Sequence, residues 1–114
     1  MNVPTIDRAT FADLQQTAGA EFVAELVGTF LTEAPRMIED LRQALTANAT
    51  DSFRRAAHSL KSNSLTFGAV TLAGMARELE LGGLDAARAN GGALDRIDAE
   101  YARVSIALQE MCNA

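Results

Sequence analysis

Residues 53–68 read FRRAAHSLKSNSLTFG, and this segment is apolar on one side only. On a helical wheel at about 100° per residue, its apolar and small residues fall on one face. They are Phe53, Ala56, Ala57, Leu60, Ser64 and Phe67. Such a stripe is typical of an amphipathic helix packed against a core. We expect the helix to begin near Thr50 or Asp51, either of which can cap it, and to end at Gly68.

Two helices are expected before this segment. A short one at about residues 7–17 would cover one end of a bundle. A long one at about residues 21–47 should bend at Pro35, because proline lacks an N–H and crowds the preceding turn. The inward residues of the long helix are predicted to be Phe22, Leu26, Phe30, Ala34, Met37, Leu41 and Leu45.

Two more helices are expected after it, one at about residues 69–81 and one at about 94–111, with glycine pairs in the link between them. Apolar residues in the last helix recur at steps of three and four, which is typical of a bundle seam. Long helices joined by short loops predict an all-α fold, an antiparallel, up-and-down four-helix bundle with a short extra N-terminal helix. The chain shows no repeat or long linker, so we expect one domain over residues 1–114 with its core at about 19–112.

Composition narrows the possible functions. The chain has 15 acidic and 10 basic residues and a net charge of −5, which argues against nucleic-acid binding. Its single cysteine, Cys112, cannot form an intramolecular disulfide. We see no signal peptide and no apolar stretch long enough to cross a bilayer, so a cytoplasmic protein without a membrane partner is expected. The initial Met1 favours a free-standing protein over a domain of a larger kinase, and one apolar face per helix favours a monomer.

His58, the one histidine of the chain, is predicted to point into solvent. It lies roughly 150° from the centre of the apolar stripe on the helical wheel. Its neighbours at spacings of three and four are Arg54, Arg55, Lys61 and Ser62, and Leu65 follows seven residues later on the same side; these residues include three cations and no carboxylate. Orientation alone leaves open that His58 and these cations are ordinary surface residues.

The run from Ala57 to Ala69 resembles the signature of the histidine phosphotransfer (HPt) family. That signature has histidine, leucine two residues later, lysine at three, a small residue at four and glycine at ten. The matching residues are His58, Leu60, Lys61, Ser62 and Gly68. The resemblance extends from about Phe11 to Leu108. Many members have glycine where this chain has Ser62, which puts the rate of transfer in question more than the function.

The resemblance implies a role for each residue. His58 would accept a phosphoryl group from, and donate it to, an aspartate of a receiver domain, and Lys61 would neutralise phosphoryl oxygens. Glu80 corresponds to a position near the histidine, where it could accept a hydrogen bond from Nδ1–H; a solvent-exposed glutamate is the competing interpretation. Partner docking would use Arg54, Arg55, Ser62 and Leu65. Gly68 would be a structural helix stop.

The resemblance also implies a phosphocarrier and not an enzyme. The chain has no glycine-rich phosphate loop, so it should neither bind ATP nor act as a kinase. No cofactor or metal is expected in this chain; magnesium would belong to the receiver partner, a response regulator or a hybrid histidine kinase. A docking module without chemistry is an alternative, although such proteins usually lack the histidine. A metal or haem bundle is disfavoured, because one histidine with Met37, Met75, Met111 and Cys112 makes no convincing ligand set.

Overall fold

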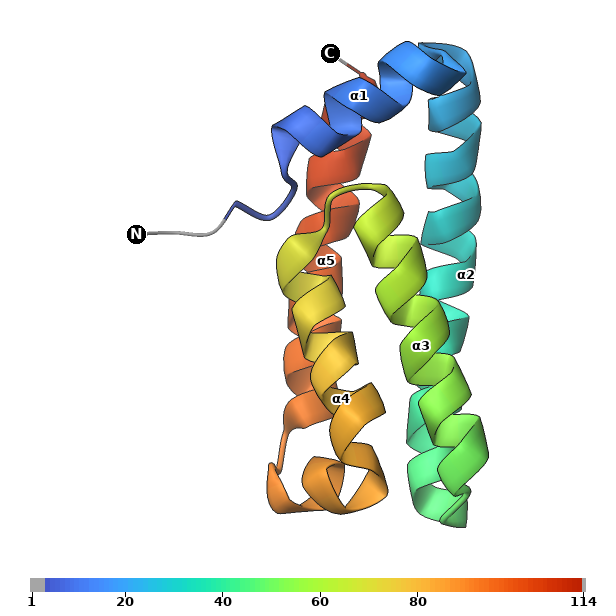
Figure 1. Ribbon diagram of the computed structural model, residues 1–114, viewed down its shortest axis with the longest axis vertical. Helices are drawn as coiled ribbons and strands as arrows, with labels where there is room; N and C mark the ends of the chain where they lie inside the picture. The colour runs from blue at the N-terminus through green and yellow to red at the C-terminus, as the bar shows by residue number, and fades with distance from the viewer. Residues whose placement is uncertain (1–3, 114) are drawn as a thin grey trace.

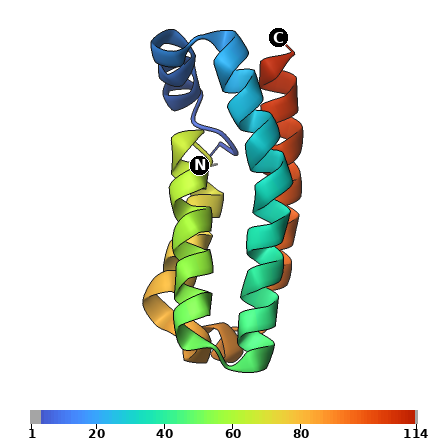
Figure 2. The same ribbon diagram turned by 90° about the vertical axis from the view of Figure 1, so that its right-hand side faces the viewer.

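The computed structural model describes residues 4–113; residues 1–3 and 114, the ends of the predicted domain, lie outside the described part. The described residues form five helices and no strand. The helices are α1 (Arg8–Ala18), α2 (Ala20–Ala47), α3 (Thr50–Thr66), α4 (Val70–Ala89) and α5 (Ala93–Cys112). Helices α2 to α5 run alternately up and down, and α1 lies across one end of them (Figures 1 and 2). The predicted all-α bundle with a short N-terminal helix is confirmed.

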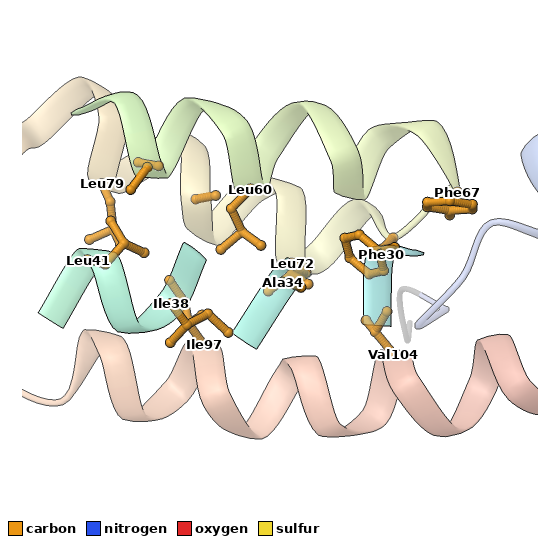
Figure 3. Close-up of a cluster of buried hydrophobic side chains, with 14 of the residues drawn as sticks. Phe30, Ala34, Ile38, Leu41, Leu60, Phe67, Leu72, Leu79, Ile97 and Val104 are labelled. Atoms are coloured by element: carbon orange, nitrogen blue, oxygen red, sulfur yellow. The ribbon is translucent and has the colours of Figure 1, made fainter. Parts of the chain in front are cut away.

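The core lies between α2, α3, α4 and α5, each of which turns one apolar stripe inward (Figure 3). The stripe predicted for α3 is buried, and Phe53 and Leu60 have no exposed surface. Burying a side chain of this size stabilises the fold by roughly 1.5–3 kcal/mol. None of the described helices is long and apolar enough to cross a bilayer.

The prediction for the inner face of α2 is wrong at its first turn. Phe22 is 51% exposed, and Val23 and Val27 are buried instead. The buried stripe of α2 contains Val23, Val27, Phe30, Ala34, Ile38, Leu41 and Ala44. Phe22 lies about 100° from the centre of that stripe on a helical wheel. Residues Leu26, Met37 and Leu45 lie at its edges and are partly buried.

Helix α2 passes through Pro35 without ending. Proline cannot donate the hydrogen bond that the carbonyl of Leu31, four residues earlier, would otherwise accept. The Tyr101 hydroxyl of α5 donates to that same Leu31 oxygen at 3.1 Å. Burial raises the pKa of Tyr101, which keeps the hydroxyl protonated as a donor. Tyr101 of α5 thus supplies the hydrogen-bond donor that the Leu31 carbonyl lacks because of Pro35.

The C-terminus of α3 depends on Gly68. Its N–H donates to the carbonyl of Leu65 at 3.1 Å, and the N–H of Ala69 donates to that of Ser64 at 2.9 Å, which together form a Schellman motif. Gly68 has a φ of +79°, and a Cβ atom there would lie 2.8 Å from the carbonyl oxygen of Asp7. The Gly68 carbonyl also accepts a hydrogen bond from the Asp7 N–H at 2.7 Å. Glycine therefore ends α3 and lets the N-terminal segment dock.

One predicted cap and one predicted helix boundary are wrong. Helix α3 begins at Thr50, as predicted, but its N-cap is Ala49, whose methyl group cannot cap; Asp51 lies in the first turn, where its charge still favours the helix dipole. Helix α4 does not stop at residue 81 but continues to Ala89 through a break at Gly83, where φ is +68°. The continuation is stable because Leu84 and Ala87 are buried.

The C-terminal part of α4 also stabilises the C-terminus of α2. Arg88 donates from Nη2 to the Leu45 carbonyl at 3.0 Å and to Oδ1 of Asn48 at 2.9 Å. Both acceptors lie where α2 ends, a place where helix carbonyls lack internal donors. The predicted link between the last two helices is therefore largely a helical segment.

We expect Tyr101→Phe to lower the free energy of unfolding by about 1 kcal/mol, because the Leu31 carbonyl loses its donor. In a Pro35→Ala background the restored N–H supplies that carbonyl, so the same substitution should cost less. Urea unfolding of the wild type, both single variants and the double variant measures the difference. An equal cost of Tyr101→Phe in both backgrounds would contradict this account.

Gly68→Ala should destabilise the protein by about 1–3 kcal/mol, because alanine is strained at positive φ and its Cβ would press on Asp7. Gly74→Ala, in an open position on α4, is the matched control. It should stabilise by roughly 0.5–1 kcal/mol, since glycine is a poor helix former. Urea unfolding of the two variants should therefore show shifts of opposite sign; two shifts of the same sign would refute the role given to Gly68.

Candidate functional site

His58 lies in the middle of α3 and points outward, as predicted, with 59% of its side chain exposed. Its neighbours Ala57 and Leu60 have no exposed surface. Because these residues are fixed in the core, α3 cannot roll about its axis without opening the packing. The imidazole is thus presented to solvent from a rigid helix.

Glu80 of α4 joins the histidine to the lysine one turn further along α3. Its Oε2 lies 2.7 Å from Nδ1 of His58, and its Oε1 accepts a hydrogen bond from Nζ of Lys61 at 2.6 Å. The side chains of Glu80 and Lys61 are only 22% and 23% exposed. The competing interpretation of Glu80 as a solvent-exposed glutamate is wrong.

The charge on Glu80 determines which ring nitrogen of His58 carries the proton. The hydrogen bond from Lys61, and secondly that from His58, lowers the pKa of Glu80. An ionised carboxylate can only accept hydrogen bonds, so Nδ1 of His58 must be the donor. In the neutral ring the proton is then on Nδ1, and the lone pair of Nε2 is free. Free Nε2 in an exposed ring is a competent nucleophile.

The other predicted site residues surround His58 without contacting Glu80. Arg54, Arg55 and Ser62 are exposed, and Leu65 is 50% exposed. On the helical wheel Arg54 and Leu65 lie on the side of α3 that faces α4, whereas Arg55 and Ser62 lie on the opposite side. The structure therefore brings His58, Lys61 and Glu80 together and leaves the other four as a ring around them.

An open groove of about 940 Å³ between α2 and α3 was not predicted from the sequence. Its lining includes Arg36 of α2 and Arg55 and Ser59 of α3. A signal for it exists in the sequence, because Glu33, Arg36, Asp40 and Gln43 recur on one polar flank of α2 at spacings of three and four. Which helix that flank would face could not be read from this spacing.

Comparison with known proteins agrees with this geometry. A protein-family model described as the Hpt domain matches residues 25–113. The chain belongs to the Hpt domain family. It is therefore a histidine phosphotransfer domain of the kind used in phosphorelays, a phosphocarrier and not a kinase. No curated protein sequence matches closely enough to add a relative.

A solved structure supports the assignment over nearly the whole chain. The crystal structure of histidine-containing phosphotransfer protein B (HptB) from Pseudomonas aeruginosa PAO1 matches with a TM-score of 0.85 and 28% sequence identity. The match covers 98% of this chain and 97% of that one. The Hpt bundle is thus shared from end to end, including α1.

The lowered pKa of Glu80 predicts how its contribution to stability depends on pH. The ionised, hydrogen-bonded form should stabilise the fold above the ordinary pKa of 4.5, and this contribution should fall as the pH drops through the lower pKa of the folded state. The free energy of unfolding of the wild type minus that of Glu80→Gln, measured from pH 7 to pH 3, reports it. In a Lys61→Met background the decrease should shrink, because Lys61 is the main cause; an unchanged decrease would contradict this assignment.

Proposed function

We propose that this Hpt domain accepts a phosphoryl group on Nε2 of His58 from an aspartate of a receiver domain, and returns it to such an aspartate. The observation that carries the proposal is the pair of contacts to Glu80. They place the imidazole proton on Nδ1, and they leave Nε2 unprotonated in a ring that is mostly exposed. A receiver can therefore reach the nucleophilic atom directly.

The chemical step is an in-line exchange. Nε2 attacks phosphorus, the bond between phosphorus and the aspartate oxygen breaks, and the aspartate leaves as a carboxylate. The ring keeps its Nδ1 proton and gains positive charge, which the negative charge of Glu80 offsets at 2.7 Å. The reverse reaction follows the same path, so the partners set the direction of net transfer.

Lys61 serves this site through its contact with Glu80 and through its charge. Its ammonium group keeps Glu80 ionised and fixed, which in turn orients the histidine. The same group lies one turn from His58 on α3, within reach of a phosphoryl oxygen. To neutralise that oxygen, Lys61 must share its three donors between Glu80 and the phosphoryl group.

The partner would dock on the exposed ring around His58. Leu65 would supply an apolar contact, while Arg54 and Arg55 would set orientation and Ser62 would leave room beside the imidazole. The partner would be a response-regulator receiver domain or a hybrid histidine kinase. It would supply the magnesium ion, and one monomeric Hpt domain would suffice for the exchange.

Phosphotransfer is tested by mixing the protein with receiver domains that carry labelled aspartyl phosphate. His58→Ala, with its fold checked by circular dichroism, is the control. Acid-labile, alkali-stable label on the wild type and none on the variant would support the proposal. If neither receivers nor phosphoramidate label the wild type, the carrier function is wrong and the domain is a docking module.

Leu65→Glu should weaken receiver binding about tenfold, which corresponds to losing roughly 1.4 kcal/mol of apolar contact, and should leave the bundle folded. Ile106→Glu, at a 59% exposed position on α5, is the matched control and should bind normally. Titration of each variant with a labelled receiver, together with the rate of transfer, measures the effect. Normal binding and transfer by Leu65→Glu would remove Leu65 from the docking surface.

A further inference from the structure

The contact between His58 and Glu80 also determines the direction in which a phosphoryl group would point. The two nitrogens flank Cε1 of the imidazole ring and point in widely divergent directions in the ring plane, and Nδ1 faces Glu80 of α4. Nε2 is therefore turned away from α4. A phosphoryl group on Nε2 would therefore project away from Glu80, over the exposed face of α3 that borders the groove between α2 and α3.

The groove between α2 and α3 carries charges of both signs, because two arginines and three acidic residues line it. The arginines are Arg36 and Arg55, and the acidic residues are Glu33, Glu39 and Asp40. Helices α2 and α3 are antiparallel and lie side by side near the loop that joins them (Figures 1 and 2). In the groove between them, the turn of α2 that carries Arg36 therefore lies across from the turn of α3 that carries Ser59, next to His58. Arg55, three residues before His58, lines the same groove.

These two arginines differ from Lys61 in their availability. Lys61 already donates to Glu80 at 2.6 Å, on the Nδ1 side of the ring. Within residues 4–113, neither Arg36 nor Arg55 has a carboxylate within salt-bridge distance, and Arg55 uses only Nε, which donates to the Asp51 carbonyl at 3.5 Å. Guanidinium groups are well suited to phosphoryl oxygens because they present several donors in one plane.

We propose that Arg36 of α2, together with Arg55, binds the phosphoryl group carried on Nε2 of His58. This inference rests on the proposed function, and it adds a residue from a second helix to the site. Arg36 stabilises the developing charge during transfer to the ring and holds the phosphoryl group afterwards. Lys61 then acts mainly through Glu80, from the opposite side of the ring.

The acidic residues of the groove provide a second test, because removing a negative charge there should have the opposite effect to removing a positive one. Asp40 lines the groove on α2, four residues from Arg36. Its carboxylate repels a phosphoryl dianion and competes for the guanidinium group. Removal of that charge by Asp40→Asn should therefore speed phosphorylation, whereas removal of the Arg36 charge should slow it.

The experiment uses phosphoramidate, a small donor that needs no docking surface. Arg36→Gln should slow phosphorylation of His58 by about threefold to tenfold, the range for a charge-assisted contact partly open to water. It should also speed hydrolysis of the phosphohistidine, followed by ³¹P NMR. Arg77→Gln, an equal charge change on an exposed residue of α4 one turn from Glu80, is the matched control and should have little effect.

Each outcome has one meaning. If the wild type is not labelled at His58, the proposed function fails. If the wild type is labelled and Arg36→Gln reacts normally with phosphoramidate, or if Arg77→Gln is slowed equally, the role of Arg36 at the phosphoryl group is refuted. Slowing of receiver transfer alone by Arg36→Gln would assign the residue to the partner interface and would equally overturn this proposal.

Discussion

The Glu80 carboxylate is the interaction on which the site depends. It accepts from the imidazole with one oxygen and from the lysine with the other, and both donors come from α3 while the acceptor comes from α4. A carboxylate that is mostly shielded from water must keep such partners, because removal of either would leave part of its charge uncompensated. The pair of contacts therefore fixes the ring orientation, its tautomer and the relative position of the two helices at once.

Such a contact requires that α3 and α4 keep their axial register. The loop between them is short, because Gly68 ends α3 with a positive φ. The Gly68 carbonyl also accepts a hydrogen bond from the Asp7 N–H. On the other side of the bundle, the bond from Tyr101 to the Leu31 carbonyl ties α5 to α2 at the place where Pro35 opens the backbone. The turn at Gly68 and the bond from Tyr101 each satisfy backbone groups that have no partner within their own helix. Each also fixes the axial register of the helices that it joins.

How far the sequence predicts this structure depends on how local the information is. The inner and outer faces of α3 follow from periodicity within one segment, and so do the exposure of His58 and the stop at Gly68. Phe22 is exposed because Val23 and Val27, and not the larger aromatic residue beside them, continue the buried stripe of α2 into its first turns. The helix after Gly83 was missed because a glycine pair indicates a break but does not show that Leu84 and Ala87 resume packing beyond it.

The pairing of Glu80 with His58 could not be obtained from spacing, since 22 residues and a helix reversal separate them. Resemblance placed Glu80 near the histidine, but only the packing of α4 against α3 decides between a bonded and a solvated carboxylate. The same is true of Arg36, whose flank of α2 is visible in the sequence although its neighbour is not. Once Glu80 takes Nδ1, however, the chemistry of the ring leaves a single direction for Nε2. On the proposal made above, Arg36 and Arg55 would contact the phosphoryl group from the α2 side, and Lys61 would act mainly by holding Glu80.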